Sequence, residues 1–129
     1  MYSVDIPIKL PSLNDYIRAC RANKFLGAQM KKEMESEIGF YIQSLPRLTS
    51  PVRITFQWTE ATKRRDLDNI CFAKKFILDS MVKFGKLQDD NRRMVTGFTD
   101  EFYYGDDNNV RLIIKEADDE SGKTGSTSS

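Results

Sequence analysis

The stretch Arg64-Arg65-Asp66-Leu67-Asp68-Asn69 places carboxylates beside cations, and Asp89-Asp90-Asn91 repeats the pattern further along the chain. Neither kind of charge helps a hydrophobic core, and such clustering is typical of bound metal and bound phosphate. Magnesium prefers oxygen ligands, is held by one or two carboxylates and keeps several waters, so a few aspartates suit it. These residues therefore indicate a Mg²⁺ site that handles a phosphate group, although an Asp-x-Asp also occurs on ordinary solvated loops.

The 129-residue chain contains no histidine. This absence argues against a Ser-His-Asp or Cys-His nucleophile and against a zinc hydrolase with imidazole ligands. A calcium loop of the EF-hand type is also disfavoured, because the residues after Asp66 lack its central Gly and terminal Glu. A metal-activated water remains the simple route to hydrolysis.

Charge is divided unevenly along the chain. Residues 1–93 carry 17 Lys/Arg against 11 Asp/Glu, a balance of +6, whereas residues 94–129 carry 3 against 8, a balance of −5, which together give the net +1. A basic surface of this kind favours a polyanionic partner such as nucleic acid. Ordinary surface solvation is the alternative.

Alternating apolar residues predict four strands that could carry these side chains. The strands are expected at 4–10, with Pro7 indicating an edge, and at 52–59, 94–103 and 110–115, the last two joined by a turn at 105–109. Apolar spacing of three and four predicts helices over 27–45, ended by Pro46, and over 67–84, closed by Gly85 as a C-cap. Residues 11–15 are expected to form a turn or loop.

On the second helix one face should pack on the sheet and the opposite face should carry polar groups. The first face holds Ile70, Ala73, Ile77, Met81 and Phe84, and the second holds Asp68, Phe72, Lys75 and Asp79. The element order predicts an α+β fold with two helices packed on a four-stranded, mostly antiparallel or mixed sheet. One domain is expected over 1–116, followed by a polar disordered tail over 117–129.

The two cysteines, Cys20 and Cys71, have no CxxC spacing and are predicted to be reduced thiols. The chain shows no charged-then-apolar leader and no apolar run of about eighteen residues, so no membrane segment is predicted. These features favour a cytoplasmic protein.

The segment RRDLDNICFAKKFILDSMVKFGKLQDDNRRMV resembles the RusA-type Holliday junction resolvases, which are small homodimeric endonucleases. Their signature is an Asp-x-Asp-Asn, a lysine, an Asp-Ala-Leu-like helical segment, a Gly and an Asp-Asp pair. The corresponding residues here are Asp66 to Asn69, Lys75, Asp79 to Met81, Gly85 and Asp89-Asp90. Pro11 to Asn14 also resembles the early Pro-x-x-Asn loop of that family, and the resemblance covers roughly residues 4 to 115.

The resemblance implies that Asp66, Asp68 and Asp90 bind magnesium, with Asp89 nearby, and that the protein hydrolyses phosphodiesters. It implies a homodimer that resolves four-way DNA junctions by paired symmetric nicks. Two alternatives stay open: a homodimer that binds branched DNA without cutting it, and a nuclease for another branched or RNA substrate.

The position of the lysine departs from the better-known members, in which it follows the second aspartate by four residues. Phe72 occupies that position here. Counting back from Asp79 selects Lys75, which helical phase places on the Asp68 face, and Lys74 is the alternative. Lys75 would stabilise the transition state or the leaving oxygen.

Cations near both acidic pairs would hold the DNA backbone. The predicted DNA-binding residues are Asn14, Arg18, Lys63, Arg64, Arg65, Lys74, Arg92 and Arg93, and Arg21 and Lys24 could act similarly. Phe72 and Phe76 are interpreted as a dimer contact or as core packing. Trp58 and the Tyr103-Tyr104 pair are expected to pack in the core and at a sheet edge rather than to stack on bases.

Overall fold

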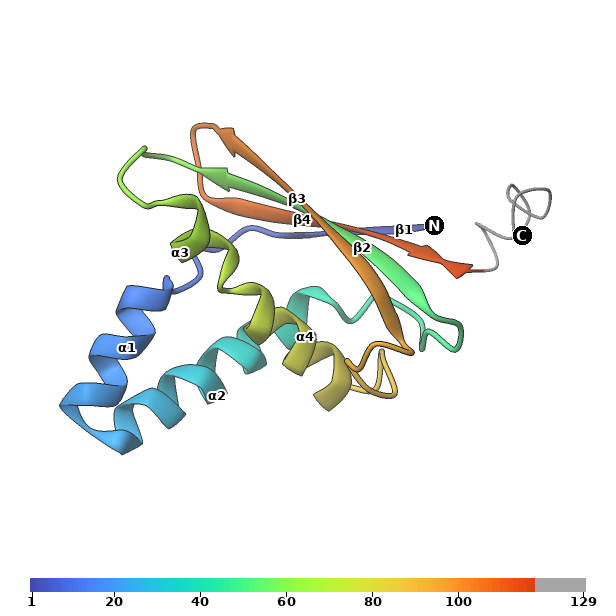
Figure 1. Ribbon diagram of the computed structural model, residues 1–129, viewed down its shortest axis with the longest axis horizontal. Helices are drawn as coiled ribbons and strands as arrows, with labels where there is room; N and C mark the ends of the chain where they lie inside the picture. Colours follow the sequence, from blue (N-terminus) through green and yellow to red (C-terminus); the bar gives the residue numbers. More distant parts are fainter. Residues whose placement is uncertain (118–129) are drawn as a thin grey trace.

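A four-stranded sheet forms one layer of the protein, as the computed structural model, which describes residues 1–117, shows (Figure 1). The strands are β1 (Tyr2–Ile6), β2 (Val52–Glu60), β3 (Val95–Tyr104) and β4 (Asn109–Glu116). Their order in space is β1-β4-β2-β3, and β2 pairs parallel with β3 whereas the other two pairings are antiparallel. The sheet is therefore mixed, and the predicted α+β fold is confirmed.

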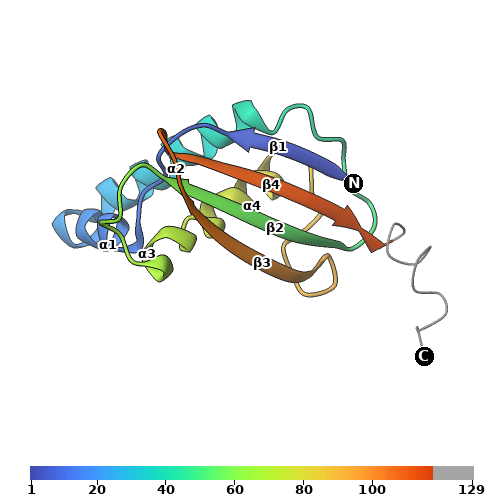
Figure 2. The same cartoon turned by 90° about the horizontal axis from the view of Figure 1, so that it is seen from above.

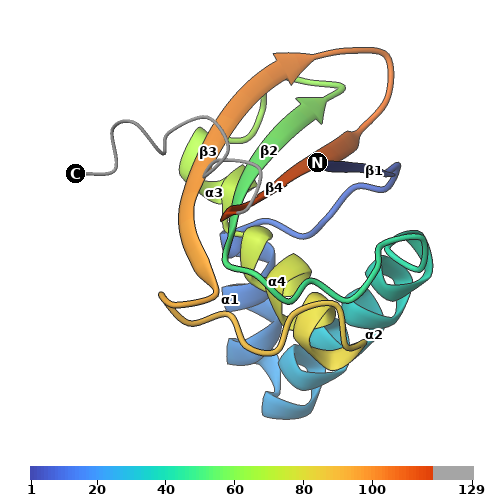
Figure 3. The same ribbon diagram turned by 90° about the vertical axis from the view of Figure 1, so that its right-hand side faces the viewer.

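The helices lie on one side of the sheet (Figures 1 and 3). They are α1 (Leu13–Ala22), α2 (Lys24–Tyr41), α3 (Leu67–Cys71) and α4 (Lys74–Lys83). Seen from above, the four strands cover α4, which runs beneath β2 and β4 (Figure 2). A two-layer arrangement of this kind buries one face of the sheet and one stripe of each long helix.

The core lies between the sheet and the helices α2 and α4. Alternate residues of β2, among them Ile54, Phe56 and Trp58, are buried, as period-2 alternation predicts. The other core side chains include Leu112, Ile114, Ile38, Ile42, Ile77 and Met81. Trp58 and Phe56 stack with ring centroids 5.5 Å apart, so the prediction that Trp58 packs in the core is confirmed.

Residues 13–22 form helix α1, so the prediction of a turn or loop over 11–15 was wrong from Leu13 onward. Ser12 begins the helix with a capping box: its Oγ accepts from the Asp15 N–H at 3.1 Å, and the Asp15 carboxylate accepts from the Ser12 N–H at 3.0 Å. Two otherwise unpaired main-chain groups are satisfied in this way. Arg18 therefore lies on a helix.

The helix predicted over 67–84 is divided into α3 and α4 at Phe72 and Ala73. The Ala73 N–H donates to the Ile70 carbonyl at 3.3 Å and the Lys75 N–H to the Phe72 carbonyl at 3.0 Å. These three-residue spacings belong to a tighter turn than the α-helix. The prediction of a single helix was therefore wrong. Because the helix is interrupted at this turn, helical phase does not place Lys75 on the same face as Asp68.

Gly85 ends α4 with a positive φ of 76°, as its predicted role of C-cap requires. Its N–H donates to the Val82 carbonyl at 3.1 Å and the Lys86 N–H donates to the Met81 carbonyl at 2.7 Å, which is the Schellman pattern. Phe84 does not face the core, in contrast to the prediction. It is 44% exposed and its ring covers Gly39 of α2, where an added Cβ would clash with it.

The first strand is shorter than predicted, and the order of the strands in the sheet was not predicted. β1 ends at Ile6, because Pro7 lacks an N–H for the ladder, and the chain then leaves the sheet. β3 and β4 follow one another in sequence but are not neighbours, because β2 lies between them. The loop that joins them crosses the end of β2, where the Gly105 N–H donates to the Glu60 carbonyl at 3.1 Å.

The predicted disordered tail lies outside the described residues except for Ala117. Within residues 1–117, Cys20 and Cys71 are both free thiols. The same part of the chain contains no helix long and apolar enough to cross a membrane.

Candidate active site

Asp66 and Asp68 stand at the start of α3 with exposed carboxylates. Asp66 is the N-cap residue in an extended conformation (φ −71°, ψ 156°), yet its side chain makes no capping hydrogen bond. An aspartate at this position ordinarily caps its helix. Within residues 1–117 neither carboxylate forms a hydrogen bond or an ion pair, so both remain available to a ligand.

The start of α1 contacts this site. The Asn14 N–H donates to Asn69 Oδ1 at 3.2 Å, across 55 positions of sequence. The contact uses the main chain of Asn14, so the side-chain amide of this exposed residue is free to meet a ligand. The structure thus brings together the two segments that the sequence analysis singled out, Pro11 to Asn14 and Asp66 to Asn69.

Arg65 fixes the loop that carries Asp66. Its Nε and Nη2 donate to the two carboxylate oxygens of Glu60 at 2.8 and 2.7 Å, and Nη1 donates to the Leu10 carbonyl at 2.9 Å. Glu60 is buried at the end of β2, so this fork satisfies a carboxylate that burial would otherwise penalise. Arg65 therefore has a structural role, and its contact with DNA stays a prediction.

Lys74 is also occupied within the fold. Its Nζ lies 2.7 Å from Asp100 Oδ2 on β3 and 4.5 Å from the centroid of the Phe98 ring. The other oxygen of Asp100 accepts from the Trp58 indole N–H at 2.9 Å. With only 18% of its side chain exposed, Lys74 holds the start of α4 to the sheet, and its contact with DNA stays a prediction.

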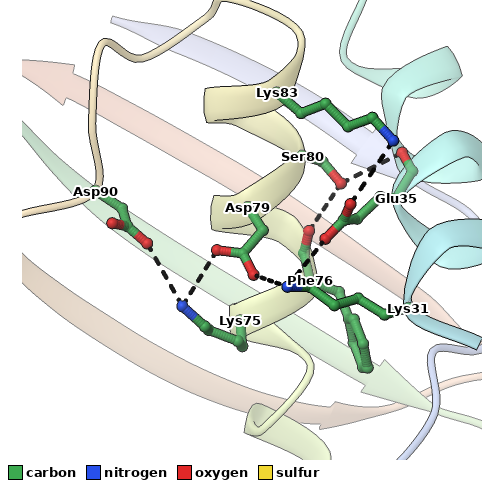
Figure 4. Close-up of polar contacts among 8 residues, drawn as sticks. All are labelled: Lys31, Glu35, Lys75, Phe76, Asp79, Ser80, Lys83 and Asp90. Atoms are coloured by element: carbon green, nitrogen blue, oxygen red, sulfur yellow. Dashed lines mark hydrogen bonds and ion pairs between the residues drawn. The ribbon is translucent and has the colours of Figure 1, made fainter. Parts of the chain in front are cut away.

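Lys75 faces the other way, and its side chain is 60% exposed. Its Nζ lies 3.2 Å from Asp79 Oδ1 and 3.8 Å from Asp90 Oδ2 (Figure 4). The chain that follows Gly85 therefore returns to the first turn of α4 and brings Asp90 to Lys75. Of the two lysines, only Lys75 lies beside an acidic residue of the predicted site.

Two comparisons with known proteins bear on this arrangement. The family model described as endodeoxyribonuclease RusA matches residues 6–115. The chain belongs to the RusA family. No curated protein matches it. The RusA family is a family of endodeoxyribonucleases, which are phosphodiester hydrolases, so the acidic and basic residues described above belong to a nuclease fold.

The described part of the candidate site has no preassembled cluster of acids. Within residues 1–117 no three His, Cys, Asp or Glu side chains are grouped so that they could hold a metal ion. Asp66 and Asp68 lie at the start of α3, whereas Asp90 lies beside Lys75 of the first turn of α4, 3.8 Å from its Nζ. The two free carboxylates of Asp66 and Asp68 nevertheless fit Mg²⁺, which needs only one or two such ligands and keeps its waters.

Asp89 is engaged by its own loop. Its Oδ1 accepts from the Asp90 N–H at 2.7 Å and its Oδ2 accepts from Asn91 Nδ2 at 3.2 Å. Such local hydrogen bonds shape a turn. Asp89 is exposed and Asp90 is half-buried beside Lys75, and the metal-binding role of both stays a prediction.

The remaining predicted DNA-binding cations are exposed. Lys63 lies over the Tyr104 ring at 4.9 Å, and Arg18 forms a weak pair with Asp15 at 3.7 Å. Exposed guanidinium groups in the two loops belong to Arg64, Arg92 and Arg93. Arg64, Arg92 and Arg93 lie close to the acidic pairs along the chain, and the DNA-binding role of these cations stays a prediction.

Asp79 belongs to the family signature but was not predicted as a catalytic or metal-binding residue, and Lys31 was not predicted in the site at all. Asp79 was placed on the polar face of the second helix, and its spacing of four from Lys75 was a usable signal for an ion pair. Lys31 lies on α2, and only the packing of α2 against α4 brings it to Asp79, at 3.2 Å. Phe76 is buried and packs edge-on against Tyr16, so Phe76 belongs to the core rather than to a dimer contact.

Proposed function

We propose that this protein is a magnesium-dependent endonuclease that resolves four-way DNA junctions by paired symmetric nicks and acts as a homodimer. The observation that carries the proposal is the pair of exposed, unpaired carboxylates of Asp66 and Asp68 in a chain of the RusA family. A two-fold dimer would present two such sites to symmetry-related strands.

Asp66 and Asp68 would hold Mg²⁺, with Asp90 as a further ligand when DNA is bound. The ion, when bound, lowers the pKa of a water molecule and neutralises charge on the phosphoryl oxygens. Hydrolysis then adds the water oxygen to phosphorus and releases one sugar oxygen. The Lys75 ammonium would stabilise the negative charge that develops on the phosphoryl or leaving oxygen.

Other residues of the chain would orient the substrate. Arg64 and Lys63 on one loop and Arg92 and Arg93 on the other would contact backbone phosphates, and the side-chain amide of Asn14 would contact DNA next to the acids. Arg65 keeps Asp66 in place through Glu60 and the Leu10 carbonyl.

The test is cleavage of an end-labelled synthetic four-way junction with Mg²⁺ and with EDTA. The wild-type protein should give symmetric nicks only with Mg²⁺, and Asp66→Asn should lower the cleavage rate by at least about a hundredfold while junction binding persists. Asp106→Asn, the same change at an exposed loop residue, is the matched control and should cleave normally.

Lys75→Met and Lys74→Met separate the two lysines in the same assay. Lys75→Met should lose most of its cleavage and keep its fold, because Lys75 is exposed, whereas Lys74→Met should lose stability and keep cleavage once folded.

A junction-binding protein without catalysis is the second candidate. The observation that favours it is the lack of a three-acid metal cluster within residues 1–117. Tight binding of the junction without metal-dependent nicks would establish that function. Replacing the junction by a flap or an RNA substrate tests the remaining alternative.

A further inference from the structure

Asp79 connects α4 to α2 through its two carboxylate oxygens (Figure 4). Oδ1 lies 3.2 Å from Lys75 Nζ, and Oδ2 lies 3.2 Å from Lys31 Nζ. Only 18% of the Asp79 side chain is exposed, so the carboxylate sits within the seam between the helices. This contact with the carboxylate raises the pKa of Lys31 above its ordinary value of 10.5.

An exposed lysine is ordinarily mobile, because its four-carbon stem has many rotamers. A lone ion pair at i,i+4 on a helix surface orders such a side chain weakly. Here, however, the carboxylate that meets Lys75 is itself held from the opposite side by Lys31. Asp79 therefore offers Lys75 a fixed partner.

The contact with Asp90 connects Lys75 to the candidate active site. Lys75 Nζ lies 3.8 Å from Asp90 Oδ2, so the ammonium stands between the carboxylates of Asp79 and Asp90. We call the series Lys31, Asp79, Lys75 and Asp90 the ion-pair chain. It begins in the seam between α2 and α4 and ends at an acid of the candidate active site.

We infer that Asp79, anchored by Lys31, is a positioning residue that holds the Lys75 ammonium beside Asp90. Its catalytic consequence rests on the proposed function, whereas the ion-pair chain rests on the contacts alone. Two experiments therefore test the inference, one without and one with DNA.

The first experiment measures the reactivity of Lys75 toward acetic anhydride in metal-free protein, read by mass spectrometry of peptides. Lys75 of Asp79→Asn should react severalfold faster than Lys75 of the wild type, since a lysine without its carboxylate partner is less shielded. Lys32, an exposed neighbour on α2, provides the reference rate. An equal Lys75 reactivity in both proteins would overturn the inference.

The Asp79→Asn variant should still fold. Lys31 keeps a second carboxylate in Asp79→Asn, because Glu35 Oε2 lies 3.7 Å from its Nζ. Thermal unfolding of each variant confirms that the comparison is made between folded proteins.

The second experiment measures kcat and KM on the four-way junction. Asp79→Asn should lower kcat roughly tenfold with little change in KM, as expected when a reacting group loses its orientation. In a Lys75→Met background the same substitution should cause no further loss, because Asp79 acts through Lys75. An equal loss in both backgrounds would show a merely structural role and would contradict the inference.

Substitutions at Lys31 complete the test. Lys31→Met should lower kcat by a smaller factor than Asp79→Asn. Lys31→Arg keeps the anchoring charge and should have the kcat of the wild type. If the wild-type protein shows no metal-dependent cleavage, the proposed function fails, and the acetylation rates still decide whether Asp79 positions Lys75.

Discussion

Lys74 and Lys75 are adjacent in sequence but have different partners. Lys74 points to the sheet, where Asp100 and the face of Phe98 surround its ammonium. Lys75 points to solvent, between Asp79 and Asp90. At the scale of single residues, burial gives Lys74 a stabilising role, and exposure leaves Lys75 accessible for the chemical role proposed for it.

The first residue-scale prediction concerns Asp100. Asp100→Asn leaves the largely buried Lys74 ammonium without a carboxylate, and we expect the free energy of unfolding to fall by about 2 kcal/mol, less than for a fully buried pair, because both side chains are partly exposed. Urea denaturation measures the change. Asp106→Asn should shift the free energy of unfolding by less than about 0.5 kcal/mol, and a similar loss in both variants would contradict the role of the Lys74–Asp100 pair.

Residue types in the sequence indicated where chemistry could occur. Asp66, Asp68 and Asp90 stood out as acids beside cations, and all three carboxylates are at least partly open to solvent, as a ligand requires. The partners of Arg65 and Lys74 could not be predicted, since Glu60 and Asp100 meet them only once β2 and β3 are in place. A charge count cannot distinguish a cation that is free for phosphate from one that neutralises a buried acid.

At the scale of elements, the capping box of α1 sets where the N-terminal segment leaves the sheet and meets the site. Ser12 is buried and its hydroxyl accepts from the Asp15 N–H. Ser12→Ala should therefore lower the free energy of unfolding by about 1 kcal/mol, measured by urea denaturation. Ser44→Ala, at an exposed serine in the turn after α2, is the control, and an equal effect of the two changes would argue against the cap.

The same cap predicts a pH dependence. The hydrogen bond from the Ser12 backbone N–H holds the pKa of Asp15 below its ordinary value of 3.8. A carboxylate with a lowered pKa contributes stability above pH 3.8, and this contribution is lost as the pH falls through the lowered value. Asp15→Asn should therefore reduce the loss of stability below pH 3.8, and an unchanged acid limb of the unfolding curve would disprove this account.

Elements with clear periodicity were predictable, and those set by local hydrogen bonds were less so. The alternation from Val52 to Trp58 gave β2, and Gly85 gave the end of α4. Helix α1 was missed although Ser12 and Asp15 have the spacing of a capping box, because the Pro11-Ser12-Leu13-Asn14 composition also suits a turn. The break between α3 and α4 has no Gly or Pro to mark it, so the apolar spacing alone predicted one helix.

At the scale of the whole molecule, the unequal distribution of charge predicts how binding responds to salt. The logarithm of the association constant for junction DNA, measured in EDTA, should fall linearly with the logarithm of the salt concentration. Replacing Arg92 and Arg93 together by Ala should reduce that slope by about 2, or about 1 for each phosphate contact. Arg47→Ala, at an exposed cation outside both acidic loops, should leave the slope unchanged.

An unchanged slope in the double variant would show that the loop after α4 does not touch the DNA backbone.

The fold class was predictable because strand and helix order restrict the possible layers. The placement of β2 between β3 and β4 was not, since consecutive strands pair more often than they are separated.

The place of β4 in the sheet has a consequence for biosynthesis. It is the last strand of the described sheet to leave the ribosome, yet it fills the gap between β1 and β2, and β1 has no other neighbour in that sheet. β1 therefore stays unpaired until β4 has been synthesised, and pairing between strands so distant in sequence slows folding. A nascent chain arrested before Asn109 should expose the unpaired edge of β1 to chaperones, and release of the final segment should close it.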